Sequence, residues 1–214
     1  WPQPDGSSLS PDIFVPLAEQ TGLISQLTHL VIEKVFEDMG YWLHLHAGQH
    51  ISINLAPADL TSGKLPPLLS HLMNKWKVHP QQIALELTER GFADPKISAP
   101  AIAAFRHSGH AIYIDDFGTG YSSLSYLQDL DVDTLKIDKA FVDALEYKNV
   151  TPHIIEMAKS LKLAMVAEGV ETEGQLAWLR RHGVQYGQGW YYSKALPKAD
   201  FILWAEDNLK THPT

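Results

Sequence analysis

The chain contains no cysteine among its 214 residues, and it contains no long apolar run. The first absence excludes disulfide bonds, thiolate catalysis and cysteine-ligated metal sites, and it is compatible with a reducing compartment. The second excludes a membrane-spanning helix in this sequence, because a span needs about 18 to 20 consecutive apolar residues. We expect a soluble, cytoplasmic domain. Whether the native protein carries a membrane anchor or a sensory domain upstream stays open.

Positive charge is also scarce. Lys and Arg number 17 against 25 Asp and Glu, which gives a formal net charge of -8 and a pI near 5.7. No run of Lys or Arg forms a basic stripe that could follow a phosphate backbone, so we exclude polymeric nucleic acid as a partner. A small phosphorylated ligand stays open, because bound divalent cations can neutralise phosphates.

Apolar residues make up 45% of the chain, and neither a low-complexity tract nor a linker divides it, which indicates one domain. Six strand-like runs alternate with helical stretches and start at intervals of about 20 to 30 residues, the length of one βα unit. The runs are Ile51–Leu55, Ile83–Thr88, Ala111–Ile114, Thr134–Ile137, Leu163–Ala167 and Val184–Gly187. The chain therefore belongs to the α/β class.

Helical periodicity supports this interpretation. A first long helix is predicted to bury one face, and so is a helix late in the chain. The two faces are Leu27, Leu30, Val31 and Val35, then Ile154, Ile155, Ala158 and Leu161. Ser10 and Pro11 predict the start of an N-terminal helix, and Pro197 predicts the start of the last one. Six βα units fit an open doubly wound sheet or most of an eightfold barrel, and no Gly-x-Gly-x-x-Gly follows the first strand, which disfavours dinucleotide binding.

Polar residues occur at the carboxyl end of every predicted strand, which is where α/β barrels place their chemistry. They are Asn54, Glu86, Glu89, Asp115, Asp116, Lys136, Asp138, Glu168, Glu171 and Gln188. Carboxylates that face a barrel interior are costly unless they are paired or bound to metal. This set therefore predicts a functional site.

The donor types predict the metal. Carboxylates and an amide oxygen, without cysteine or clustered histidine, suit Mg²⁺ or Mn²⁺ better than structural zinc. Two such ions about 3.5 to 4 Å apart activate a water and stabilise the leaving oxygen of a phosphodiester. Lys136 would orient that water or offset phosphate charge, although a structural pairing with Asp138 stays open.

Simpler interpretations exist for single residues. Asp115 and Asp116 could cap a helix, Asn54 could complete a turn, and Glu86 and Glu168 could be surface acids. Their joint occurrence at successive strand ends favours the metal site. His44 and His46 have no ligand partner at a supporting spacing, so we interpret them as a solvated helix end.

Several segments resemble the EAL-domain cyclic di-GMP phosphodiesterases, in the same order and over essentially the whole chain. They are Phe14–Glu19, Ser52–Leu55, Glu86–Glu89, Asp115–Ser123, Leu135–Asp138, Val166–Thr172 and Gln188–Gly189. The resemblance implies a modified (β/α)₈ TIM-type barrel. It also implies hydrolysis of cyclic di-GMP to linear pGpG with Mg²⁺ or Mn²⁺, and a homodimer is compatible with it.

The resemblance also implies roles for individual residues. The metal ligands would be Asn54, Glu86, Asp115 and Asp116, with Glu168 as a further ligand or general base. Lys136 would position the attacking water, and Glu89 would anchor the loop after Asp116. Glu171 and Gln188 would either contact the substrate or hydrogen-bond the metal ligands from outside the metal site.

Two departures from the family pattern bear on function. Trp1 aligns just past the Glu-Ala-Leu signature, so we expect residues 1–214 to be an EAL domain that is incomplete at its N-terminus. The first two strands, one metal-binding Glu and a phosphate-binding Arg would lie upstream, and such a chain alone would have little or no activity. Ala195 stands where the family commonly has Pro. The alternative function is a non-catalytic cyclic di-GMP receptor or a protein-interaction module, but the intact acids favour an enzyme.

Overall fold

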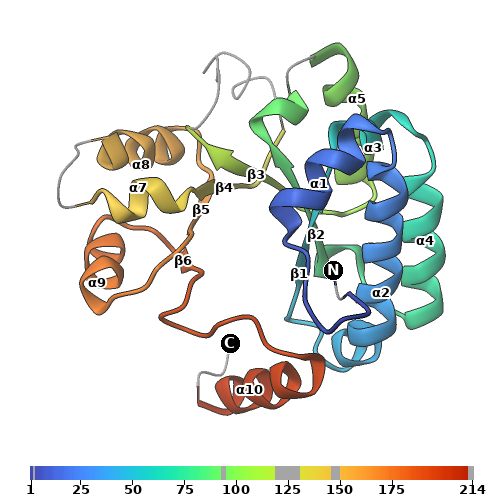
Figure 1. Cartoon of the computed structure of the whole chain (residues 1–214). Helices are drawn as coiled ribbons and strands as arrows, with labels where there is room; N and C mark the ends of the chain where they lie inside the picture. Colours follow the sequence, from blue (N-terminus) through green and yellow to red (C-terminus); the bar gives the residue numbers. More distant parts are fainter. Residues whose placement is uncertain (2, 93–94, 119–130, 146–149, 212–214) are drawn as a thin grey trace.

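Six parallel strands form one sheet that curls into a half-barrel (Figure 1). The computed structural model describes residues 1, 3–92, 95–118, 131–145 and 150–211. The strands follow one another in chain order, as β1 (Ile51–Leu55), β2 (Ile83–Thr88), β3 (Ile112–Phe117), β4 (Thr134–Ile137), β5 (Ala164–Ala167) and β6 (Tyr186–Gly187). The predicted α/β barrel-type fold is confirmed.

Helices surround the curved sheet (Figure 1). Before β3 the chain forms α1 (Pro11–Gln20), α2 (Ile24–Leu45), α3 (Pro57–Thr61), α4 (Leu65–Trp76), η1 (Pro80–Gln82), η2 (Glu89–Phe92) and α5 (Pro95–His107). After β4 it forms α7 (Lys139–Asp143), α8 (Val150–Ser160), α9 (Glu173–Arg181) and α10 (Lys198–Thr211). Among these described helices, none combines the length and the apolar character that a bilayer span requires.

The last helix returns to the β1 side of the fold, where it packs on α2 (Figure 1). The rings of Phe201 and Trp42 meet edge to face with their centroids 6.2 Å apart. Lys198 Nζ lies 3.4 Å from Asp38 Oδ1. The segment after β6 therefore links the two ends of the curved sheet.

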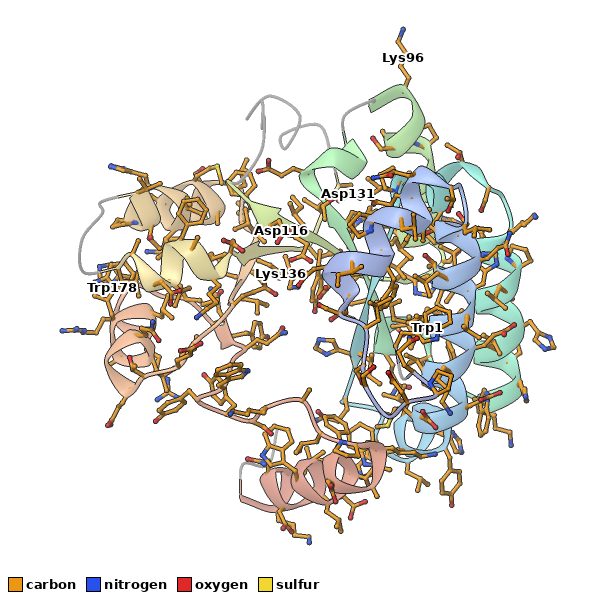
Figure 2. The ribbon with its side chains drawn as sticks, in the orientation of Figure 1. Trp1, Lys96, Asp116, Asp131, Lys136 and Trp178 are labelled. Carbon is orange, nitrogen blue, oxygen red and sulfur yellow. The ribbon has the colours of Figure 1, made fainter. Side chains whose placement is uncertain are left out.

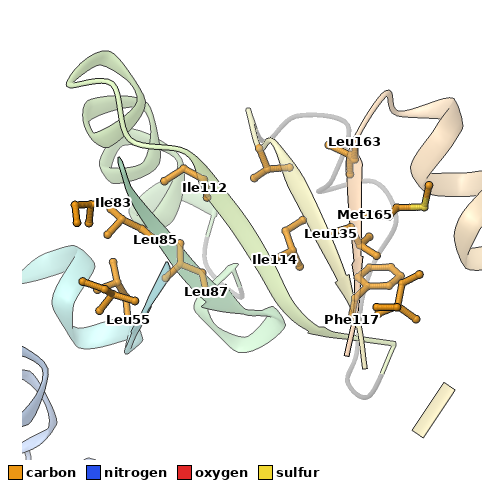
Figure 3. Close-up of a cluster of buried hydrophobic side chains, with 14 of the residues drawn as sticks. Leu55, Ile83, Leu85, Leu87, Ile112, Ile114, Phe117, Leu135, Leu163 and Met165 are labelled. Atoms are coloured by element: carbon orange, nitrogen blue, oxygen red, sulfur yellow. The ribbon is translucent and has the colours of Figure 1, made fainter. Parts of the chain in front are cut away.

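One face of the sheet carries a continuous apolar row. Residues of five strands are in register there, and every one is buried: Leu55, Leu87, Ile114, Leu135 and Met165 (Figure 3). Complete burial of such a side chain stabilises the fold by roughly 1.5–3 kcal/mol. Because successive residues of a strand point to opposite faces, the polar residues Glu86 and Lys136, each next to a member of this row, point to the other face of the sheet.

Both predicted helix starts are confirmed. Ser10 caps α1, since its side chain accepts a hydrogen bond from the backbone N–H of Asp12, and Pro11 is the first helical residue. α10 begins at Lys198, and the N–H of Phe201 donates to the carbonyl of Pro197. The predicted face of α8 is also confirmed, because Ile154, Ile155 and Ala158 are buried and Leu161 packs against the core.

The predicted face of α2 is wrong in part, since Val35 packs against the core but none of its four residues is fully buried. Its buried stripe contains Ile32, Phe36 and Leu43, whereas Leu30 and Val31 are 54% and 45% exposed. α2 carries apolar residues on two stripes, and its contacts with α4 and β1 decide which stripe is buried. Periodicity alone does not distinguish two apolar stripes of one helix.

Candidate metal and substrate site

The adjacent acids Asp115 and Asp116 lie within β3, which extends to Phe117. The prediction that the strand ends at Ile114 is therefore wrong. The pairing of β3 with β4 shifts register between Ile114 and Phe117, where three steps on β3 match two on β4. This is a β-bulge, in which an extra residue interrupts the regular alternation of side chains.

The bulge brings the two carboxylates together. Asp116 has a φ of 54°, in the left-handed region that Asp tolerates better than most residues. In a regular strand, neighbouring side chains point to opposite faces. Here ligand oxygens of Asp115, Asp116 and Glu168 all lie within 4.8 Å of one another.

Lys136 binds three acids from different parts of the sheet. Its Nζ lies 2.8 Å from Glu86 Oε2, 2.9 Å from Asp115 Oδ1 and 2.7 Å from Glu168 Oε1. Asp138, the alternative partner, instead caps α7 by accepting a hydrogen bond from the N–H of Ala140. Figure 2 shows Lys136 and Asp116 close together near the middle of the molecule.

We call Glu86, Asp115, Asp116, Glu168 and Lys136 the carboxylate cluster. Glu86, Asp115 and Lys136 are buried, which contradicts a surface role for Glu86. Burial alone would lower the pKa of Lys136, but the charge of Glu86 and hydrogen bonds to Glu168 and Glu86 outweigh it and raise that pKa. Lys136 is therefore a fixed cation within the cluster.

The carboxylate cluster holds excess negative charge. Its four carboxylates and one ammonium leave three formal negative charges. Burial raises the pKa of Asp116, and the charges of Asp115 and Asp138 raise it further. Burial also raises the pKa of Glu168, although Lys136 opposes this. Crowded oxygen donors with this charge fit Mg²⁺ or Mn²⁺.

Asn54 lies at the carboxyl end of β1, in register with Glu86 of β2. It is exposed and lines a cavity of about 670 Å³ together with Thr88 and Asp116. The structure therefore places the predicted amide ligand on the same cavity as one of the clustered acids.

Glu89 lies just after β2 and reaches the end of β3. Its Oε1 accepts a hydrogen bond from the N–H of Gly118 at 2.6 Å. Its Oε2 is buried and has no hydrogen-bond partner among the described residues. The loop that Glu89 was predicted to anchor continues through residues 119–130, which lie outside the described part of the chain.

Glu171 and Gln188 do not join the carboxylate cluster. Together with Glu168 and Trp190 they line a second cavity of about 760 Å³, which we call the groove. Lys139, which the sequence did not single out, also lines it, and its Nζ lies 2.7 Å from Glu171 Oε1. Lys139 could have been noticed in the sequence because it directly follows Asp138 at a strand end. The sequence does not show, however, that its ion-pair partner is Glu171.

The remaining candidate pair is structural. His44 Nδ1 lies 3.1 Å from the carbonyl oxygen of Lys77, and His46 Nδ1 lies 2.8 Å from that of Trp42. His44, in the last turn of α2, thus contacts the carbonyl that follows α4, whereas His46 contacts a carbonyl of the last turn of α2 itself.

The chain is similar to proteins of one known family. Residues 1–195 match the EAL domain family. A relative from Escherichia coli (strain K12), the probable cyclic di-GMP phosphodiesterase PdeB, is 71% identical over 209 residues. That alignment covers 98% of this chain but 40% of PdeB, so the chain spans less than half of the relative's length.

Solved structures show the same fold. The PaMucR phosphodiesterase in complex with c-di-GMP superposes with a TM-score of 0.87 at 34% identity, over 94% of this chain and 84% of that one. The EAL enzyme Bd1971, bound to cAMP and cyclic-di-GMP, gives a TM-score of 0.89 at 30% identity, over 95% of this chain and 57% of that one. Because the family matches residues 1–195 and the PaMucR structure superposes over 94% of the chain, the chain belongs to the EAL-domain family.

Proposed function

We propose that the native protein hydrolyses cyclic di-GMP to linear pGpG at the carboxylate cluster, with two Mg²⁺ or Mn²⁺ ions. The observation that carries this proposal is the convergence of Glu86, Asp115, Asp116 and Glu168 around Lys136. Relatives named as phosphodiesterases, and a related structure in complex with c-di-GMP, support the choice of substrate.

The metal ligands that residues 1–214 supply in this proposal are the four clustered carboxylates and Asn54. When bound, the ions supply positive charge for the phosphodiester and polarise a water. Glu168 accepts the proton of the attacking water at a carboxylate oxygen. Lys136 donates to Glu168 across 2.7 Å, and this orients the base. Glu171 and Gln188 contact the nucleotide in the groove, and Glu89 holds the backbone at Gly118.

The rest of the native protein is also a matter of proposal. Because the chain spans 40% of PdeB, we propose that a sensory or membrane domain elsewhere in the native protein regulates this site. A homodimer and a cytoplasmic location for the domain stay predictions.

The test measures how fast the native protein hydrolyses cyclic di-GMP in the presence of Mn²⁺, with the product pGpG quantified by chromatography. We expect Glu86→Gln and Asp115→Asn each to reduce kcat by more than about a hundredfold. Loss of a residue that only hydrogen-bonds a metal ligand typically lowers activity about 10- to 100-fold, and loss of a ligand should lower it more. Glu156→Gln is the matched control, since Glu156 is an exposed acid of α8 whose ion-pair partner is Lys159.

Three results would contradict the proposal. Retained turnover in both ligand variants would show that the carboxylate cluster does not perform the hydrolysis. Binding of cyclic di-GMP without any turnover in the wild type would favour the receptor alternative. Absence of both binding and turnover would remove cyclic di-GMP as the ligand.

A further inference from the structure

Lys139 connects the two chain segments that border the groove. It is the first residue of α7, directly after Asp138. Its Nζ lies 2.7 Å from Glu171 Oε1 and 3.2 Å from Asp143 Oδ1. The ammonium therefore joins α7 to the connection between β5 and α9, and the pKa of Lys139 is raised mainly by its hydrogen bond to Glu171.

The aliphatic stem of Lys139 lies directly on the turn at Gly169. This glycine has a φ of 65°, and a Cβ placed on it would lie 2.7 Å from the Cβ and Cδ atoms of Lys139. Any larger residue would displace the stem and would also be strained at this φ. The glycine thus permits close packing between the lysine and the backbone of the turn.

Further hydrogen bonds complete the connection. Gln175 Oε1 accepts from the N–H groups of Glu171 and Thr172 at 2.8 and 3.0 Å, and Gln175 Nε2 donates to Asp143 Oδ1 at 3.5 Å. An isolated exposed ion pair contributes little to stability. Here the lysine stem is packed and Gln175 bridges its partners Glu171 and Asp143, so less side-chain freedom is lost for each contact.

The connected turn carries two functional side chains. Glu168 at its start belongs to the carboxylate cluster, and Glu171 at its end faces the groove. Between them, the N–H of Val170 donates to the carbonyl of Gln188 at 3.0 Å. The Glu171 carboxylate accepts its hydrogen bond from a residue outside the turn, the ammonium of Lys139.

We propose that Lys139 is a positioning residue, which holds Glu171 in the groove and thereby strengthens binding of the cyclic dinucleotide without acting on the metals. This inference rests on the proposed function. It predicts an effect of Lys139 on KM rather than on kcat.

The first experiment measures hydrogen–deuterium exchange of residues 168–175 in the ligand-free native protein. Lys139→Met keeps the stem and removes the ammonium, Lys139→Arg keeps a cation, and Lys159→Met removes another exposed lysine that pairs with Glu156 on α8. We expect faster exchange in Lys139→Met, restoration in Lys139→Arg and no change in Lys159→Met. Unchanged exchange in Lys139→Met would overturn the inference.

The second experiment measures steady-state hydrolysis of cyclic di-GMP. We expect Lys139→Met to raise KM roughly three- to tenfold with kcat within about twofold, and to leave the Mn²⁺ dependence unchanged. In a Glu171→Gln background the same substitution should have little further effect, because its target is already lost. A fall in kcat alone, or equal effects in both backgrounds, would overturn the inference.

The two experiments separate failure of this inference from failure of the proposed function. A wild type that hydrolyses cyclic di-GMP while Lys139→Met keeps its KM leaves the function standing and removes the role of Lys139. If the wild type neither binds nor hydrolyses cyclic di-GMP, the proposed function and the effect of Lys139 on KM are both refuted. Hydrogen–deuterium exchange still tests whether Lys139 holds the turn at residues 168–175.

Discussion

At the residue scale, Lys136 decides how four acids can share one site. It contacts Glu86, Asp115 and Glu168, which come from β2, β3 and the end of β5. A buried ion pair adds little stability compared with apolar residues of similar size. Removal of one partner, however, destabilises the fold because the other charge stays buried without a counter-charge. The acids could be found from the sequence because each follows an apolar run. The central place of the lysine could not, because the sequence of β4 does not show which side chains of the neighbouring strands lie beside Lys136.

We expect Lys136→Met to lower the free energy of unfolding of the metal-free protein by about 3–5 kcal/mol, because it leaves like charges buried together. Urea denaturation in the presence of a chelator measures this change. Lys159→Met, at an exposed pair, should change the same quantity by less than about 0.5 kcal/mol. Equal stability of the two variants would contradict the role of Lys136 as the compensating charge.

At the element scale, β3 shows that an apolar pattern does not always predict where a strand ends. Its apolar start was predicted, but two adjacent acids do not resemble a strand, since Asp is depleted in strands. The pairing with β4 nevertheless continues to Phe117 through a bulge. The face of α2 shows the same limit, because neighbours and not periodicity decide which apolar stripe is buried.

His110 joins two elements and gives the fold a pH dependence. It lies between α5 and β3, is 4% exposed, and its Nδ1 lies 2.9 Å from the carbonyl oxygen of Ile83 at the start of β2. Burial lowers its pKa below 6.5, the ordinary value. The unfolded chain therefore binds a proton at a higher pH than the native protein does, so stability falls as pH decreases below the ordinary value.

The free energy of unfolding should thus decrease more between about pH 7.5 and about pH 5.5 in the wild type than in His110→Gln, which cannot take up this proton. Each unit by which the pKa is lowered corresponds to about 1.4 kcal/mol. Urea denaturation at both pH values measures the difference. Parallel losses in the two proteins would show that His110 does not contribute.

At the scale of the whole molecule, the parallel sheet collects residues that are distant in sequence. Asn54, Glu86, Asp115 and Glu168 come from four βα units, and the common direction of the strands places all of them at one end of the half-barrel. The α/β class followed from the spacing of the runs, and the barrel type followed from the family resemblance. That Glu171 and Gln188 line a groove which adjoins the carboxylate cluster at Glu168 did not follow from either.

A divalent cation should stabilise the whole domain, because it binds the native carboxylate cluster and not the unfolded chain. Mn²⁺ at about 100 times its Kd contributes about 2.7 kcal/mol. For a domain of this size that corresponds to a rise in Tm of about 5–10 °C. Differential scanning calorimetry with Mn²⁺ and then with a chelator measures it.

Asp116→Asn should reduce that rise in Tm, while Glu156→Gln, on the surface of α8, should keep it. Asn tolerates the left-handed conformation at position 116 as Asp does. The bulge should therefore persist in this variant, which lacks only the negative charge of the Asp116 carboxylate. An equal rise in both variants would place the cation elsewhere.

The six strands, the acids at their ends and the family could be predicted before the fold was known, because they depend on local periodicity and on residue types in a fixed order. Which side chains meet could be seen only in the folded chain. A bulge and a left-handed residue turn Asp115 and Asp116 toward Glu168, and a glycine without a side chain lets Lys139 reach Glu171. Both outcomes depend on backbone conformation and on packing between distant segments, and neither is encoded in the spacing of residues along one strand.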